Sequence, residues 1–149
     1  MKSPSRTRSL PRSPARRWSE AVERLYSRRR RHLAAGRRLL WDGRVDTLRL
    51  SPGHIQGFIY TRDSRFVLVN IRLPPASAET LFALEASSLR IECSEKQHPG
   101  LSRFAAATLL AVAQTLRRDP AAAARLLPGA PPGGHAEREE TRSPAGNPD

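Results

Sequence analysis

The sequence predicts an α+β fold, and three patterns carry that prediction. Apolar residues recur at helical spacing within residues 17–40, then at every second position in three runs between residues 44 and 73, and an Ala- and Leu-rich run covers residues 102–118. We expect a basic N-terminal helix, a three-stranded antiparallel meander and an Ala-rich C-terminal helix. The length of 149 residues suits one such domain rather than two.

The first expected helix covers residues 17–40. Its apolar face is formed by residues at steps of four, three and one, namely Trp18, Val22, Leu25 and Tyr26. Ser19 is a candidate N-cap. Gly36 is expected to interrupt or bend the helix, because a glycine in a helix interior costs about 1 kcal/mol relative to alanine.

Three strands are expected next, near residues 44–50, 54–60 and 65–73. Short polar turns over residues 51–53 and 61–64 join them, so consecutive strands should pair antiparallel. The third strand is almost continuously apolar, which indicates that it is the best buried of the three.

The rest of the domain is expected to be mainly helical. A proline pair ends the third strand, and residues 76–86 show a helix-compatible pattern with Ser77 as a candidate cap. Residues 89–93 alternate as a short strand does. An Ala- and Leu-rich helix is expected over residues 102–118, and one or two further helical turns are expected at residues 121–127.

The two ends of the chain are expected to be disordered, over residues 1–16 and 128–149. They are rich in Ser, Pro, Arg and Gly, and they lack the apolar residues that would offset the entropy of ordering. The ordered domain should therefore cover residues 17–127.

Positive charge is concentrated near the N-terminus. The chain has 26 Lys and Arg against 14 Asp and Glu, a net charge of +12, and the first 44 residues account for +11 of it. No apolar run has the length of a membrane span and no secretory signal pattern opens the chain, so we expect a cytoplasmic protein. The single cysteine, Cys93, excludes an internal disulfide.

Arginines of this basic region form the candidate binding site. Guanidinium groups pair bidentately with phosphate oxygens, and a cluster of them repels itself unless anions lie nearby. The candidate nucleic-acid-binding residues are Arg24, Arg28, Arg29, Arg30, Arg31, Arg37, Arg38 and Arg44. On one helix Arg24, Arg28 and Arg31 would share a face. A solvated helix with a coding bias toward arginine is the main alternative, and a membrane surface is a weaker one.

No pattern in the sequence supports catalysis. The motifs of a phosphate-binding loop, a nucleophile elbow and a zinc protease are missing. The four histidines are scattered along the chain, at His32, His54, His98 and His135. We expect no enzyme, no catalytic residue and no cofactor.

Three aromatic residues lie on neighbouring expected strands, Phe58, Tyr60 and Phe66. Exposed aromatic rings on a sheet stack with single-stranded bases in many small binding modules. Phe58 and Tyr60 share one face by the strand period, and we expect them in the core rather than in such a site.

Short glycine, proline and arginine motifs follow one another in a set order. They are Gly36-Arg37-Arg38, Gly43-Arg44-Val45, Ser51-Pro52-Gly53-His54-Ile55 and Arg72-Leu73-Pro74-Pro75, preceded by a helix that contains Trp18. This order resembles the N-terminal region of bacterial SWIM zinc finger family proteins over residues 17–127. The resemblance implies DNA binding and protein association, often beside SNF-type helicases.

The SWIM motif itself is degenerate in this sequence. In that family Cys-x-Cys and Cys-x-His hold zinc before an Ala-rich helix, and the corresponding positions here are Ile91, Cys93, Leu101 and Arg103. Cys93 is the one ligand type retained, whereas structural zinc needs four ligands. We therefore expect no metal site within one chain. A site with four ligands would need Cys93 and His98 from each of two chains.

The function expected from these patterns is that of a non-catalytic accessory protein that binds nucleic acid through its Arg-rich N-terminal arm and helix, with DNA favoured over RNA. Such a protein would be nucleoid-associated if it binds DNA. The alternative is a protein-interaction adaptor that docks on a helicase or another DNA-processing enzyme.

Overall fold

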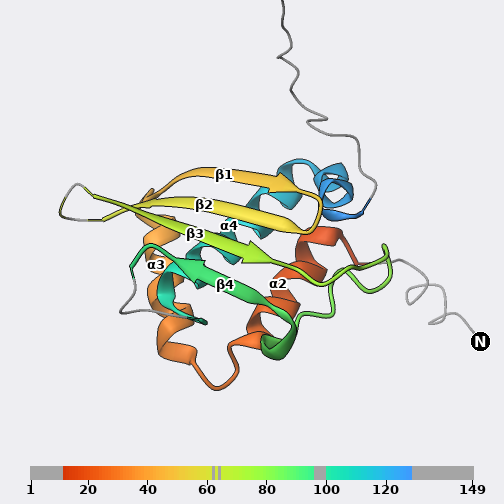
Figure 1. Ribbon diagram of the computed structural model, residues 1–149, viewed down its shortest axis with the longest axis horizontal. Coiled ribbons are helices and arrows are strands. Elements are labelled where there is room, and N and C mark those ends of the chain that lie inside the picture. Colours follow the sequence, from red (N-terminus) through yellow and green to blue (C-terminus); the bar gives the residue numbers. More distant parts are fainter. Residues whose placement is uncertain (1–11, 62, 64, 96–99, 129–149) are drawn as a thin grey trace, which may run out of the picture.

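Four strands form one antiparallel sheet in the order β1–β2–β3–β4 (Figure 1). They are β1 Val45–Ser51, β2 His54–Tyr60, β3 Phe66–Arg72 and β4 Arg90–Cys93. The computed structural model describes residues 12–61, 63, 65–95 and 100–128, and most of the two expected tails lies outside these ranges. The predicted α+β fold is confirmed, with one strand more than the meander was expected to have, because the short strand expected over residues 89–93 pairs with β3.

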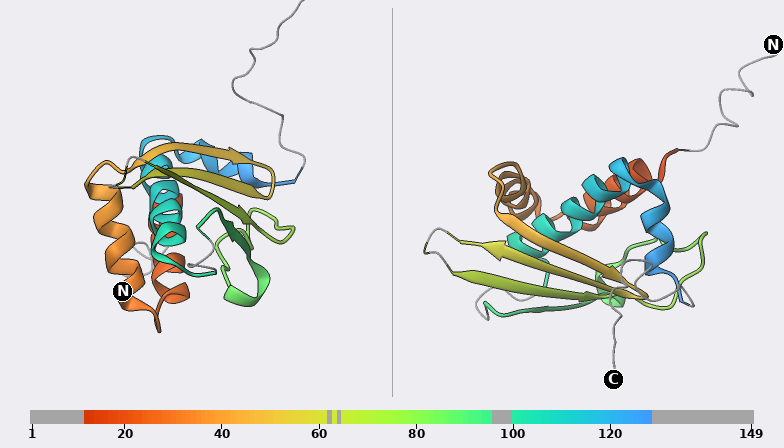
Figure 2. Two further views of the ribbon diagram at one scale, coloured as in Figure 1. Left: turned by 60° about the vertical axis from the view of Figure 1, so that its left-hand side comes forward. Right: turned by 90° about the horizontal axis from the view of Figure 1, so that it is seen from above.

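In the described part of the chain, helices α2, α3 and α4 and the 3-10 helix η2 lie on one face of this sheet. Helix α4, Arg103–Arg118, packs across the strands, and helices α2, Pro14–Leu25, and α3, Arg30–Trp41, pack against α4. The 3-10 helix η2, Pro120–Leu126, follows α4 and contacts β1. It corresponds to the helical turns expected over residues 121–127. Figure 2 shows the helices on one side of the strands and no element on the other side. The sheet therefore has a covered face and an open face.

The strands alternate between these two faces. The side chains that β2 and β3 bury under α4 are those of Ile55, Ile59, Val67, Val69 and Ile71. Successive side chains of a strand point to opposite faces, so the residues between them lie on the open face. The expectation that Phe58 and Tyr60 lie in the core is wrong, and β3 is buried on one side only.

The expected helix over residues 17–40 is two helices. Helix α2 starts at Pro14, capped by the Ser13 side chain rather than by Ser19, and ends at the C-cap Tyr26. The buried Tyr26 hydroxyl donates to the carbonyl oxygen of Ser102 at 2.9 Å, which fixes the chain at the end of α2. The break lets α3 turn back along α4; a straight helix of that length would extend about 36 Å, beyond the sheet.

Gly36 does not interrupt α3, contrary to expectation. It is buried where α3 crosses α4, and a Cβ atom there would lie 2.5 Å from the Ala106 Cβ and 2.8 Å from the backbone nitrogen of Ala107. Gly57 of β2 makes a similar close approach from the sheet side, where a Cβ would lie 2.6 Å from Thr108 Oγ1. The two glycines thus let α4 sit tightly between α3 and the sheet.

Residues 76–86 do not form the expected helix. The Ser77 hydroxyl accepts the backbone N–H groups of Glu79 and Thr80, and this closes a single turn that buries Leu81 and Phe82. The chain then has to extend toward β4, with one 3-10 turn at Ala86–Ser88. A side-chain-capped turn after two prolines thus replaces a helix.

The helix expected over residues 102–118 is confirmed as α4. The Ser102 side chain caps it by accepting from the Ala105 N–H at 3.2 Å, and Arg117 and Arg118 stand in its last turn. It is buried almost all round because the sheet covers one side and α2 and α3 cover the other. Its many alanines permit both close contacts.

Burial of Tyr26 should make stability fall at alkaline pH. Burial raises the pKa of Tyr26 above its ordinary value of 10.0, so the folded protein holds a proton that the unfolded chain releases. This contribution to stability is full below about pH 10 and is lost as the pH rises further. Tyr26→Phe should cost about 1 kcal/mol at neutral pH and flatten the alkaline decline, as measured by guanidinium unfolding at several pH values.

Both proteins in that comparison should carry Cys93→Ser, because burial also raises the pKa of the Cys93 thiol. Equal alkaline declines with and without the Tyr26 hydroxyl would show that this group is not responsible.

Candidate nucleic-acid interface

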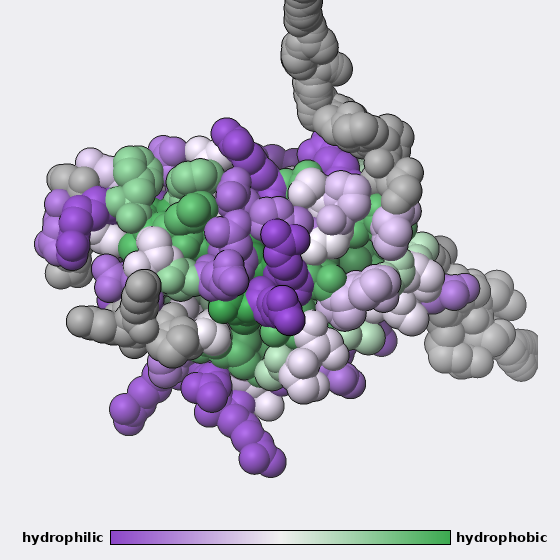
Figure 3. Space-filling model, viewed as in Figure 1, coloured by the Kyte–Doolittle hydropathy of each residue, from purple (hydrophilic) through white to green (hydrophobic). Residues whose placement is uncertain are grey.

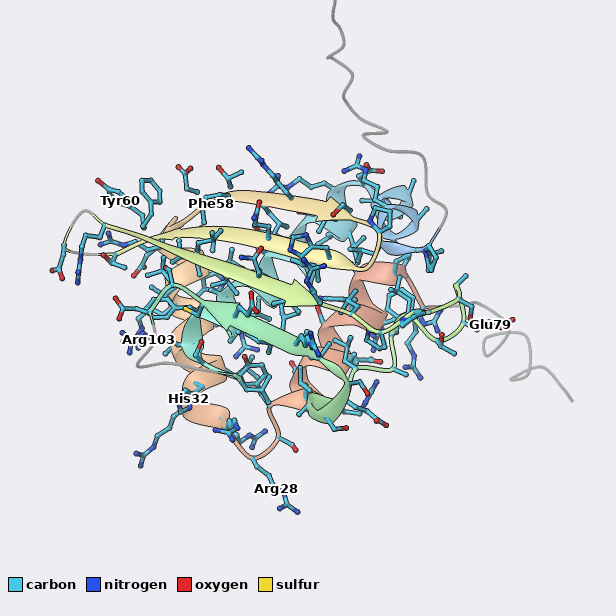
Figure 4. The ribbon with its side chains drawn as sticks, in the orientation of Figure 1. Arg28, His32, Phe58, Tyr60, Glu79 and Arg103 are labelled. Atoms are coloured by element: carbon cyan, nitrogen blue, oxygen red, sulfur yellow. The ribbon has the colours of Figure 1, made fainter. Side chains whose placement is uncertain are left out.

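Four consecutive arginines, Arg28–Arg31, cover the end of the α2–α3 connection and the start of α3, and we call them the arginine turn. All four side chains are exposed. Arg29 is the N-cap of α3 and its side chain makes no capping hydrogen bond. Arg28 points away from the body of the molecule (Figure 4). The arginine turn is therefore fully accessible to a ligand.

Without a bound anion, the charges of the arginine turn repel one another and interact unfavourably with the dipole of α3. Arg30 and Arg31 stand in the first turn of α3, where the helix dipole favours negative charge, and that turn has no acidic residue. Within the described part of the chain, no carboxylate lies within 4.0 Å of these guanidinium groups, whereas Arg37 pairs with Glu23 at 3.7 Å. A bound anion would relieve this repulsion.

The other predicted arginines are divided between two sides of α3. Arg24 is exposed in the last turn of α2 and, because the helix breaks, shares no helix face with the arginine turn. Arg37 lines a hollow between α2, α3 and α4 together with the exposed Trp41. Arg38 and Arg44 lie on the opposite side of α3, beside the β2–β3 hairpin.

A groove of about 430 Å³ separates α3 from the β2–β3 hairpin, and we call it the hairpin groove. Its cations are Arg38 of α3, Arg44 just before β1 and Arg103 at the start of α4. Its acids are Asp42 and Asp63, and Asp63 lies 3.3 Å from Arg65. Arg103 stands at a zinc-ligand position of the SWIM-like pattern, and its place in this basic groove was not predicted from the sequence.

Arg31, the last residue of the arginine turn, lies on the groove side of α3. Arg31, Ala35 and Arg38 are spaced by four and three residues, so they lie on one face of α3. Ala35 and Arg38 line the groove. The positive surface therefore continues from the arginine turn along α3 into the groove.

An exposed aromatic pair stands at the far side of this groove. Tyr60, which lines the groove, and Phe66 face each other across β2 and β3 with ring centroids 4.9 Å apart. Their exposed fractions are 38% and 53%. Figure 4 shows Phe58 and Tyr60 at the same end of the sheet. Phe58 has the guanidinium carbon of Arg49 at 5.9 Å from its ring centroid.

The middle of the open face is polar. Asn70 Oδ1 accepts from Gln56 Nε2 at 3.1 Å and lies 2.9 Å from His54 Nε2. Arg72 and Arg90 are cross-strand neighbours on the same face. Figure 3 shows this face, with hydrophilic side chains across its middle and a hydrophobic area toward the hairpin end.

The positions that correspond to a zinc motif lie on β4 and at the start of α4. Ile91 and Cys93 are half-buried strand residues, Leu101 packs against the core, and Arg103 lies with its guanidinium carbon 4.8 Å from the centroid of the Phe104 ring. In the described residues no three side chains of the ligand types gather where they would hold a metal ion. His98 and His135 lie outside the described residues.

Comparisons of this chain with protein-family models, with curated proteins and with solved structures find no match. None of the helices in the described ranges is long and apolar enough to cross a membrane. The case for a function therefore depends on the geometry and charge of the interface itself.

Proposed function

We propose that this protein binds nucleic acid without catalysing a reaction and that the arginine turn supplies its phosphate contacts. One observation carries the proposal: Arg28–Arg31 are exposed, consecutive and unpaired among the described residues, at the helix end where positive charge is least favourable. Nucleic acid is the polyanion that best matches several adjacent guanidinium groups.

The binding should have little sequence preference. Contacts between arginine and phosphate fix the position of a protein on nucleic acid, but they carry no information about the bases. The hairpin groove adds three more cations on the same side of α3. DNA is the favoured ligand, as the sequence resemblance implies, and RNA is the second, because the phosphate contacts are common to both.

Changing Arg28–Arg31 to glutamine should weaken binding strongly and make it less dependent on salt. If the wild-type protein contacts four to six phosphates, the logarithm of its affinity for a duplex should fall against the logarithm of the salt concentration with a slope of roughly −4 to −5. The variant should lose about two to four units of that slope, since each lost contact accounts for about 0.9. Fluorescence anisotropy at several salt concentrations measures both quantities.

A pair of double variants provides a control with equal charge change. Arg29→Gln/Arg30→Gln removes two arginines from the arginine turn, whereas Arg117→Gln/Arg118→Gln removes two exposed arginines from the last turn of α4. The first should reduce affinity and slope, and the second should leave both close to wild type. Equal effects would indicate a response to net charge alone. Unchanged binding in all variants would contradict the proposal and favour the protein-interaction adaptor.

A further inference from the structure

We propose that the nucleic acid is single-stranded and that its bases stack on Tyr60 and Phe66 at the hairpin end of the open sheet face. This inference rests on the proposed function, because it names the class of nucleic acid that the same surface takes. It assigns a role to the open face, which the helices leave uncovered (Figure 2).

The exposure of the aromatic pair is the first argument. Tyr60 and Phe66 are cross-strand partners, and an aromatic pair of that kind contributes roughly 0.2–1 kcal/mol to a sheet. That contribution needs ring contact but not the exposure of 38% and 53% that these rings keep. Exposed ring faces beside a basic groove form a stacking platform for bases.

The charge around the pair is the second argument. Tyr60 also lines the hairpin groove with Arg38, Arg44 and Arg103, so a strand whose bases stack on the open face would find cations for its adjoining phosphates around the hairpin end of the sheet. Asp63, one of the two acids there, already has Arg65 as a partner at 3.3 Å. A polyanion with exposed bases complements this arrangement; an apolar peptide or an acidic peptide without rings satisfies one half of it.

The path of the ligand follows from the geometry of α3. Arg31 and Arg38 lie on one helix face, about 10 Å apart along the axis at 1.5 Å per residue. A backbone that contacts the arginine turn and continues into the groove would reach Tyr60 with its bases. Phosphates would then contact α3 while bases contact the sheet.

A duplex does not fit this contact. Its bases are paired and stacked inside the helix, so their ring faces are not available to protein side chains unless a base is extruded. A single strand presents every base, and stacking on aromatic side chains tolerates all of them. Stacking on this pair should therefore favour single strands over duplexes without adding a preference for particular bases.

The test compares one oligonucleotide as a single strand and as a duplex. The variant Tyr60→Ala/Phe66→Ala should bind the single strand at least tenfold more weakly than wild type, and its duplex affinity and salt slope should stay within twofold of the wild-type values. An abasic phosphodiester strand should bind wild type and variant alike. Fluorescence anisotropy measures all of these, and thermal melting checks that the variants fold.

Two control variants separate stacking from other effects. Tyr60→Phe keeps the ring and should bind the single strand as wild type does. Trp41→Ala removes an aromatic side chain that is 76% exposed but lies on the other side of α3, and it should change neither affinity.

The outcomes for the two proposals differ. If Tyr60→Ala/Phe66→Ala binds the single strand as well as wild type, or if Trp41→Ala weakens it equally, the stacking site is wrong while phosphate binding by the arginine turn still stands. If wild type binds neither strand form in a salt-dependent way, the proposed function fails and this inference fails with it.

Discussion

Trp18→Ala should unfold the protein or leave it barely stable. Trp18 is completely buried and its indole N–H donates to the carbonyl oxygen of Leu109 at 2.8 Å. Its ring also meets Phe82 edge to face with centroids 6.3 Å apart. Truncating a buried tryptophan to alanine costs about 3–5 kcal/mol, a large part of the stability of a small domain. The melting temperature should fall by more than about 10 °C.

Trp18→Phe separates the ring from its hydrogen bond. Phenylalanine keeps most of the apolar contact but has no N–H group for Leu109, so we expect a loss of about 1–2 kcal/mol. A Trp18→Ala protein that melts within a few degrees of wild type would show that α2 does not hold the helical layer together.

Gly36→Ala should destabilise the protein by about 2–3 kcal/mol, although alanine is the better helix former. Helix propensity alone would predict a gain of about 1 kcal/mol. The new Cβ would lie 2.5 Å from the Ala106 Cβ and 2.8 Å from two backbone atoms of α4, which have no freedom to move aside. Overpacking of that kind forces the two helices apart. Chemical denaturation gives the free energy of unfolding and therefore shows whether the substitution stabilises or destabilises the protein.

Gly43→Ala is the matched control for this substitution. Gly43 has φ +73° and no other described atom within 4 Å of the position of a Cβ, so its replacement adds backbone strain without a clash. It should cost about 1 kcal/mol. A Gly36→Ala protein more stable than wild type would mean that α3 does not approach α4 so closely.

The parts of the fold that depend on local pattern were predictable from the sequence. The three strands of the meander and α4 follow from short-range periodicity, with boundaries close to those observed. The helix break was not, because no glycine or proline, the usual sign of a break, stands between Tyr26 and Leu33. What ends α2 is a contact between Tyr26 and Ser102, which no local pattern contains.

The face of the sheet was assigned wrongly for a related reason. Phe58 and Tyr60 share one face by the strand period, and that face was taken for the core. The alternating set Ile55, Gly57 and Ile59 carries no polar residue, whereas the set with Phe58 and Tyr60 includes His54 and Gln56. That contrast was a usable signal. Gly57 made this signal hard to recognise, because a glycine does not look like a core residue in the sequence. The structure shows that Gly57 is small because Thr108 lies against it.

The candidate interface was predictable in part. The exposure of Arg28–Arg31 follows from their charge. The hairpin groove does not, since Arg44, Tyr60 and Arg103 are far apart in sequence and are brought together by α4 and the sheet.

The buried position of α4 has a consequence for how the chain folds. Its partners α2 and α3 precede it by most of the length of the domain, as the contacts of Trp18 with Leu109 and of Tyr26 with Ser102 illustrate. Contacts of high sequence separation slow folding, because a long loop must close before they form. During synthesis the basic N-terminal helices emerge first and have no apolar surface to bury against until α4 follows them. A growing chain therefore presents its arginines before it has a folded domain to support them.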